Sequence, residues 1–214
     1  MYDTIIFDLD GVIIDSETYY CKSIYNFFLI EGYPISQQAS YQYAGLSPAR
    51  GESLTKKLLG DSLGADLWHR HLNQVLNNPL DYKSIVIPGV ISLLDFSKMH
   101  SLKIGLASSG IRNNILNVLN ILNISDYFDF VITGDDVANS KPDPEIYIRA
   151  AEYLNTSTDR CIVIEDSAPG ITAAVQAGAY VIAKKDTRFG HSQELADIVC
   201  DNMYSIKSHI ESLL

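Results

Sequence analysis

Two aspartates follow the first apolar segment of the chain. Residues 5–7 predict a short strand, Asp8 and Asp10 come next, and Gly11 indicates a turn. Side chains two residues apart on a strand share a face, so the two carboxylates would raise each other's pKa. Two chemistries use such a pair: a divalent cation bridges the acids, or one acid attacks while the other carries a proton. An ordinary solvated turn is the competing interpretation, whereas a calcium loop is disfavoured because the preceding segment is strand-like.

Strands and helices alternate from residue 87 onward. We expect strands at 103–107, 130–133, 161–164 and 180–183, and helices at 113–122, 145–154 and 168–177. The strands are uniformly apolar, which is typical of a parallel sheet covered by helices on both faces. The predicted fold class is therefore α/β, and the first strand belongs to the same sheet.

Polar residues gather where the predicted strands end. Ser108 and Ser109 follow the second strand, Lys141 follows the third, and Glu165 and Asp166 end the fourth. Taken singly, Ser108 could cap a helix, Lys141 could be a loop lysine, and the two acids could favour a helix start. Ligands bind beyond the carboxyl ends of such strands, so the coincidence favours one site. Carboxylates suit a cation of the magnesium type, while the serine and lysine suit phosphate oxygens.

A helical segment interrupts the α/β pattern. Residues 16–81 have helical spacing and many aromatic residues, which we interpret as the core of a small bundle inserted after the first strand. The α/β domain would then comprise residues 1–15 and 82–214, with linkers near residues 15–18 and 78–86. The inserted domain would comprise residues 16–81.

The composition and net charge of the chain exclude several classes of protein. The chain has 214 residues, 47% of them hydrophobic, which predicts one core with a smaller lobe. A formal net charge of −10 argues against nucleic acid and anionic membranes as partners, because both require a basic face. The three cysteines are far apart and lack metal-ligand spacing, so we expect reduced thiols and a cytoplasmic location. We expect no signal peptide and no transmembrane segment, and the oligomeric state stays open.

Four segments together resemble a known family. Residues 8–12 (Asp-Leu-Asp-Gly-Val), 107–110 (Ala-Ser-Ser-Gly), 140–143 (Ser-Lys-Pro-Asp) and 165–167 (Glu-Asp-Ser) are similar to the four motifs of the haloacid dehalogenase superfamily. The resemblance is to its branch of phosphoglycolate and sugar-phosphate phosphatases and beta-phosphoglucomutases. It implies a Rossmann-like parallel sheet and a small helical cap domain, at the place where the inserted segment lies.

The resemblance also implies roles for the motif residues. Asp8 would be the nucleophile that forms an aspartyl-phosphate, and Asp10 would be the general acid and base. Ser108 would bind phosphate, and Lys141 would steady both the nucleophile and the phosphoryl group. Mg²⁺ would be the cofactor, held by Asp8, the backbone carbonyl of Asp10 and Asp166, with Glu165 in or near its coordination shell.

The cap residues favour hydrolysis over phosphoryl transfer to a sugar. The mutases have a histidine where this chain has Tyr20 and a lysine where it has Ala44. In the α/β domain, a mutase lysine after the motif serine is also replaced, by Ile111. Gly45 and Arg50 are the candidate substrate-binding residues of the cap, and Arg50 could replace the mutase arginine that grips a second phosphate. We therefore expect a phosphatase of small phosphorylated metabolites, such as sugar phosphates or phosphoglycolate. The alternative is a beta-phosphoglucomutase that interconverts glucose 1-phosphate and glucose 6-phosphate.

Three other functions are disfavoured. Carbon–halogen hydrolysis does not need a second acid, yet Asp10 is present. A phosphonate hydrolase would need a buried cap lysine, and nothing marks Lys22, Lys56 or Lys57 as buried. A non-catalytic phosphosugar-binding protein would be expected to lose Asp8 or Asp10, and the chain keeps both.

Two further groups of residues have ordinary interpretations. Lys184, Lys185 and Arg188 follow the last main strand, and we interpret them as part of a solvated loop. His69 and His71 lie two residues apart on a predicted helix and so do not share a face, which argues against a zinc site.

Overall fold

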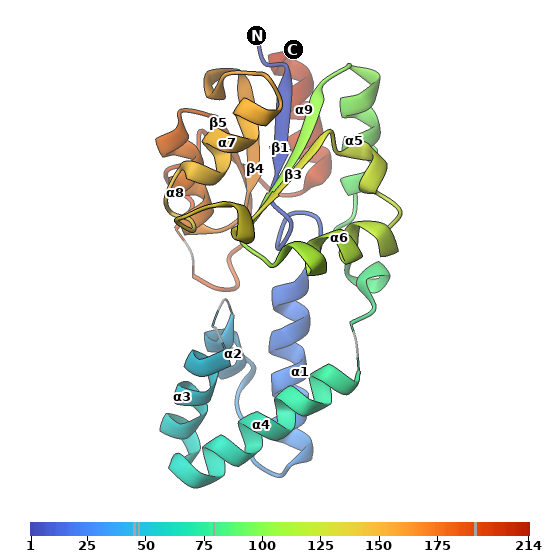
Figure 1. The fold of residues 1–214 in the computed structure, drawn as a ribbon. Helices are drawn as coiled ribbons and strands as arrows, with labels where there is room; N and C mark the ends of the chain where they lie inside the picture. Colours follow the sequence, from blue (N-terminus) through green and yellow to red (C-terminus); the bar gives the residue numbers. More distant parts are fainter. Residues whose placement is uncertain (45, 47, 79, 191) are drawn as a thin grey trace. The chain divides into compact units, whose positions relative to one another are not determined.

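The alternating segments form the predicted parallel sheet. The computed structural model describes residues 1–44, 46, 48–78, 80–190 and 192–214. Within those residues the sheet has six strands in the order β3-β2-β1-β4-β5-β6, and every paired neighbour is parallel (Figure 1). The strands are β1 Thr4–Phe7, β2 Lys103–Ser108, β3 Phe130–Thr133, β4 Cys161–Glu165, β5 Tyr180–Lys184 and β6 Ile198–Cys200.

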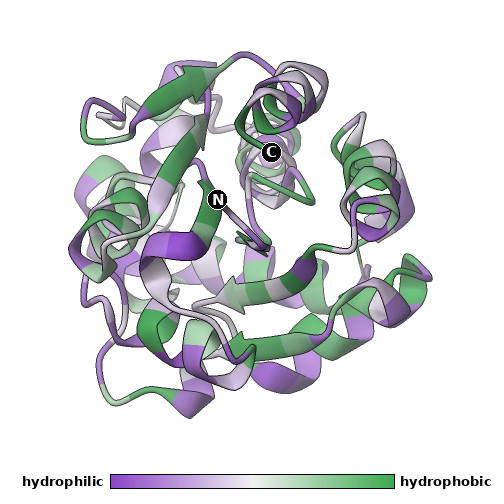
Figure 2. Cartoon of the chain, turned by 90° about the horizontal axis from the view of Figure 1, so that it is seen from above, coloured by the Kyte–Doolittle hydropathy of each residue, from purple (hydrophilic) through white to green (hydrophobic). Residues whose placement is uncertain are grey.

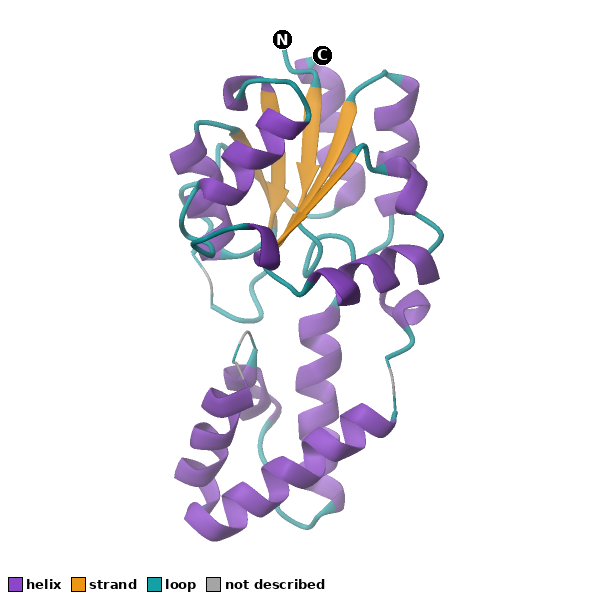
Figure 3. Cartoon of the chain, viewed as in Figure 1, coloured by secondary structure: helices purple, strands orange, loops and turns teal. Residues whose placement is uncertain are grey.

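Helices connect the strands and cover both faces of the sheet (Figure 3). They are α5 Val90–Met99, α6 Arg112–Ile121, α7 Glu145–Tyr153, α8 Ala168–Ala177 and α9 Met203–Leu213. Short 3-10 turns lie at Tyr82–Ile85, Ser125–Tyr127, Gly134–Asp136 and Thr158–Arg160. The expected α/β fold class is confirmed. The last strand and helix, β6 and α9, were not predicted.

Two hydrophobic layers hold the sheet between the helices. On one face, α5, α6 and α9 pack Leu93, Val118 and Ile206 against the strands. On the other face, α7 and α8 pack Tyr147 and Ile171. The strands are mostly coloured as hydrophobic in Figure 2, because both of their faces are buried.

The chain divides into two compact units, residues 1–15 with 82–214 and residues 16–81. The second, helical unit contains α1 Ser16–Ile30, α2 Gln37–Ser40, α3 Pro48–Leu59 and α4 Asp61–Asn77, with a 3-10 turn at Tyr41–Tyr43. It has a core of its own that includes Phe28, Leu67 and Trp68, and the Trp68 ring stacks on Tyr43 with 5.6 Å between ring centroids.

The described residues contain no helix that is long and apolar enough to span a membrane. The cysteines at positions 21, 161 and 200 are buried and form no disulfide. Their burial agrees with the expectation of reduced structural thiols.

Candidate active site

The turn after β1 brings Asp8 close to the end of β4. The Asp8 amide donates to the Ile164 carbonyl at 3.0 Å, which extends the pairing of β1 with β4 by one residue. Gly11 follows with a φ of +78°, and a Cβ atom at this position would lie 1.9 Å from Asp166 Oδ2. Only glycine therefore lets the turn pass this close to the Asp166 carboxylate.

Lys141 links three strand ends. Its Nζ lies 2.5 Å from Asp8 Oδ1 and 2.7 Å from Glu165 Oε1, and it donates to the Ala107 carbonyl at 3.0 Å. The lysine side chain is only 6% exposed. Burial alone would lower the pKa of Lys141, but Asp8 and Glu165 raise it well above the usual range, so the lysine is charged.

Hydrogen bonds occupy both oxygens of Glu165. Oε1 accepts from Lys141 and from the Tyr147 hydroxyl at 2.9 Å. Oε2 accepts from the backbone amides of Asp166 and Ser167 at 2.9 and 3.0 Å and from the Ser167 hydroxyl at 3.0 Å. A Cβ atom at Gly170 on α8 would lie 1.7 Å from Oε1. The fold therefore fixes the Glu165 carboxylate, and through it Lys141.

The described part of the chain holds a cluster of three buried carboxylates that could bind a metal ion, from Asp8, Glu165 and Asp166. One oxygen of each lies within 4.8 Å of the others. Asp166 is 7% exposed, and among the described residues its carboxylate accepts no hydrogen bond. A buried carboxylate without a donor favours a cation beside it, so the residues fit a divalent metal that prefers oxygen ligands.

The pKa values of the acids at this edge of the sheet also favour a divalent cation. Burial raises the pKa of Asp166 well above its usual value, and the negative charges of Glu165 and Asp8 raise it further, although Lys184 opposes that shift. Burial also raises the pKa of Asp8, although Lys141 opposes that shift. A divalent cation would lower both pKa values and keep the carboxylates ionised.

Ser108 lies at the end of β2 and is buried. Its Oγ accepts from the Gly110 amide at 3.2 Å. The alternative in which Ser108 caps the next helix is wrong, because α6 begins at Arg112, whose amide donates to Asp135 at 2.9 Å. Ser109 is exposed.

Asp10 lies outside the carboxylate cluster. It is exposed, and its backbone forms an isolated bridge with Ile14. Its negative charge raises the pKa of Asp8, so the two acids interact as the sequence suggested.

The substrate residues that were predicted for the cap belong to the helical unit. Gly45 lies outside the described residues. Arg50 is exposed on α3, and Tyr20 is 43% exposed on α1. Lys22 and Lys57 are exposed and Lys56 pairs with Glu52, so this unit contains no buried lysine of the phosphonate-hydrolase type.

Sequence reasoning missed Tyr147 and misjudged Lys184. Tyr147 is fully buried on α7, and Lys141 Nζ lies 4.9 Å from its ring centroid in addition to the shared contact with Glu165. A tyrosine within an apolar helix face suggests core, and only its position six residues after Lys141 links it to the site. Lys184 was expected in a solvated loop, but it is the last residue of β5 and is only 8% exposed.

A parallel sheet with buried acids and a buried lysine at its carboxyl edge is typical of α/β proteins that bind a ligand at this edge. Comparisons with known proteins identify the family. The profile of the haloacid dehalogenase-like hydrolases matches residues 5–184. The chain belongs to this family, and the expected superfamily and type of enzyme are confirmed.

Relatives include both phosphatases and mutases. A phosphorylated carbohydrates phosphatase of Thermotoga maritima is 30% identical over 176 residues, covering 82% of each chain. A beta-phosphoglucomutase of Bacillus subtilis is 30% identical over 187 residues, covering 83% of this chain and 81% of the other. The crystal structure of beta-phosphoglucomutase from Clostridium difficile superposes with a TM-score of 0.70 and 28% identity, covering 99% of this chain and 96% of that one.

Proposed function

We propose that this protein is a metal-dependent phosphatase of small phosphorylated metabolites, with Asp8 as the nucleophile. The contact of Lys141 with both Asp8 and Glu165, beside the unpartnered Asp166 carboxylate, is the observation that carries this proposal. Phosphoryl transfer requires a fixed nucleophile and positive charge around the moving group, and this arrangement suits both requirements.

The residues divide the reaction into two steps. The Asp8 carboxylate attacks phosphorus, and Asp10 gives its proton to the leaving alkoxide oxygen. Asp10 then takes a proton from water, whose oxygen attacks the aspartyl-phosphate and releases inorganic phosphate together with the free Asp8 carboxylate. The Ser108 hydroxyl and the Lys141 ammonium hold the phosphoryl oxygens throughout.

Asp8 and Asp166 are the side chains that would hold the metal ion, together with the backbone carbonyl of Asp10. The metal, for which we propose Mg²⁺, would neutralise charge on the transferring phosphoryl group. Glu165 is already occupied by Lys141, Tyr147 and Ser167, so we assign it the role of positioning Lys141 beside the metal.

Sugar phosphates are the proposed substrate class. The relative from Thermotoga maritima is named for phosphorylated carbohydrates, and the family profile is that of hydrolases. The relative named beta-phosphoglucomutase keeps mutase activity as the second candidate. Tyr20 and Ala44 favour hydrolysis, because the mutases have basic residues at these positions.

The proposal is tested by assaying a panel of phosphomonoesters that includes beta-glucose 1-phosphate, 2-phosphoglycolate and several hexose 6-phosphates. Each ester is assayed with Mg²⁺ and with a chelator, and both released phosphate and sugar products are measured. We expect phosphate release from one or a few esters, lost on chelation and restored by added Mg²⁺. Asp8→Asn should lower turnover by a factor of about 10³ or more while the fold is kept.

Two results would contradict the phosphatase proposal. Conversion of beta-glucose 1-phosphate to glucose 6-phosphate with a bisphosphate primer, and with little free phosphate, would identify a mutase. Absence of any turnover, in a preparation that binds phosphate at Ser108, would favour a non-catalytic binding protein.

A further inference from the structure

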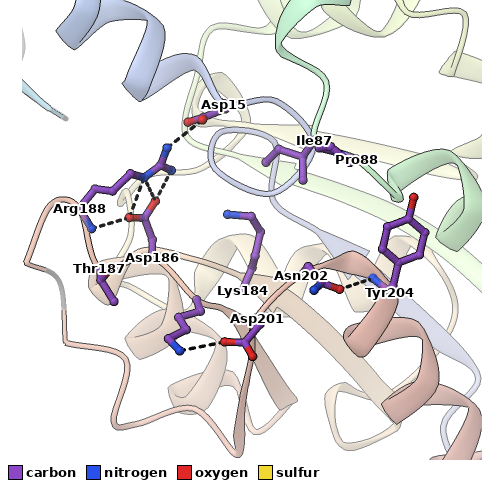
Figure 4. A pocket seen from close by; sticks show the side chains of 11 residues that line it. Asp15, Ile87, Pro88, Lys184, Asp186, Thr187, Arg188, Asp201, Asn202 and Tyr204 are labelled. Atoms are coloured by element: carbon purple, nitrogen blue, oxygen red, sulfur yellow. Dashed lines mark hydrogen bonds and ion pairs between the residues drawn. The ribbon is translucent and has the colours of Figure 1, made fainter.

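A cavity lies at the carboxyl ends of β5 and β6, beside the carboxylate cluster. Its volume is about 520 Å³, which is in the range of small-molecule sites. Figure 4 shows the residues that line it: Asp15, Ile87, Pro88, Lys184, Lys185, Asp186, Thr187, Arg188, Asp201, Asn202 and Tyr204. None of them has a role in the proposed phosphoryl transfer.

Lys184 points into this cavity, and its positive charge acts to lower the pKa values of the nearby Asp166 and Asp186 carboxyl groups. Its side chain extends from the end of β5 between Asp186 on one side and Ile87 on the other (Figure 4). The residue is only 8% exposed, yet its ammonium forms no hydrogen bond or ion pair with any residue that the structure describes. The two acids offset the charge of Lys184, but a buried ammonium that lacks a hydrogen-bond acceptor still favours a ligand that supplies one.

The other charges of the cavity are already paired. Lys185 contacts Asp201 at 2.8 Å. Arg188 contacts Asp15 at 2.8 Å and forms a second ion pair with Asp186. Among the described cations that line the cavity, Lys184 is the one that forms no ion pair, so its ammonium can contact a charged ligand.

The start of α9 provides a second donor and a favourable field. Asn202 is the N-cap residue, and its Oδ1 accepts from the amides of Tyr204 and Ser205, each at 3.0 Å. The side-chain NH₂ of Asn202 is thus left as a donor, and the positive end of the helix dipole lies at the cavity wall. Ile87 and Pro88 add an apolar surface on which the body of a ligand could pack.

We propose that this cavity binds a small metabolite through its oxyanion group, a phosphate or a carboxylate, which contacts the Lys184 ammonium and the Asn202 amide. The site is separate from Ser108 and Lys141. Glu165 pairs with Ala183 in the sheet, so Asp166, which follows β4, comes directly after the same register position as Lys184, the last residue of β5. An anion bound here would therefore lie one strand away from the proposed metal ligand.

The test is a nuclear magnetic resonance titration of the full chain in metal-free buffer. Inorganic phosphate and succinate are titrated separately, so that the two sources of an oxyanion are distinguished. Backbone amide signals of residues 185–188 and 202–205 report on the cavity, and those of residues 108–110 report independently on the proposed active site. The inference therefore does not depend on the proposed function.

Lysine variants give the comparison that decides the proposal. Lys184→Met keeps the length of the side chain but removes its charge, and Lys185→Met does the same to the paired neighbour. We expect saturating shifts at the cavity signals with at least one anion. The dissociation constant should rise about tenfold or more in Lys184→Met and less than about threefold in Lys185→Met. Lys184→Arg, which keeps the charge, should bind the anion more tightly than Lys184→Met.

Two outcomes would overturn the proposal. One is the absence of saturation at the cavity signals by either anion up to about 20 mM. The other is an equal effect of Lys184→Met and Lys185→Met, with the remaining amide spectrum of each variant matching that of the wild type.

Discussion

Glu165 acts here as a support for Lys141. Its carboxylate receives the Tyr147 hydroxyl and the Lys141 ammonium on one oxygen, and backbone amides on the other. The lysine is thereby held between two acids, with 2.5 Å to Asp8 Oδ1. A fixed ammonium beside the proposed nucleophile would stabilise transition-state charge without reorganisation during the reaction.

The variant Tyr147→Phe tests whether the Tyr147 hydroxyl supports Glu165, because it removes only that oxygen atom. The change removes the 2.9 Å hydrogen bond to Glu165 and leaves the buried ring in place. Because a hydrogen bond to a charged group contributes about 1.5–3 kcal/mol, we expect kcat/KM to fall by a factor of about 10 to 100. The fall should be mainly in kcat, since Tyr147 has no proposed contact with substrate.

The matched control is Tyr153→Phe on the same helix. Tyr153 is 56% exposed and stacks on Phe130 away from the acids. Removal of the Tyr153 hydroxyl should leave kcat/KM within about twofold of the wild-type value. Equal kinetics for the two variants would show that the Tyr147 hydroxyl does not support the site.

At the scale of elements, the ends of the strands were predictable from sequence. Each central strand is apolar until its last residues, so the change to Asp8, Ser108 or Glu165 marks both the end of the strand and the site. The strand at 130–133 and the helix at 168–177 have the predicted bounds, while the helix at 113–122 is displaced by one residue.

Neither β6 nor the burial of Lys184 could be predicted from the sequence, and each has a physical reason. β6 has three residues, one of them exposed, so its pattern does not differ from that of a loop. Lys184 has a long charged side chain, and such residues are almost always exposed. Its burial depends on tertiary packing at the end of β5, and a pattern along the chain does not contain that information.

The packing of α4 against α1 makes the helical unit sensitive to acid. His71 is 2% exposed, its Nε2 contacts Ser23 Oγ at 3.3 Å, and its Nδ1 has no partner among the described residues. Burial lowers the pKa of His71 from 6.5 to about 4. Between pH 6.5 and about 4, His71 therefore binds a proton in the unfolded chain but not in the folded unit. The free energy of unfolding consequently falls as the pH decreases through this window.

We expect the wild type to lose up to about 3 kcal/mol of unfolding free energy relative to His71→Leu between pH 7 and pH 4.5. Urea unfolding followed by Trp68 fluorescence reports on this unit, because Trp68 is the only tryptophan of the chain and lies beside His71. His69→Leu is the control, since the His69 side chain is 62% exposed. An identical pH dependence for the wild type and His71→Leu would contradict the argument.

On the scale of the whole molecule, a net charge of −10 opposes an anionic substrate. The carboxylate cluster adds to this opposition at the very edge of the sheet where the phosphoryl group is proposed to bind. Lys141 neutralises only part of this negative charge, so the proposed reaction requires a divalent cation at Asp8 and Asp166. In that reaction Asp8, held by Lys141, becomes covalently phosphorylated.

Chemical trapping of that intermediate is the most direct test. The enzyme is mixed with the best substrate of the panel and Mg²⁺, quenched in acid during turnover, and reduced with borohydride, which converts an aspartyl-phosphate to homoserine. Peptide mass spectrometry should find homoserine at position 8, and none without substrate or in Asp8→Asn. Steady turnover with no modification at position 8, or with homoserine at another aspartate, would contradict the account.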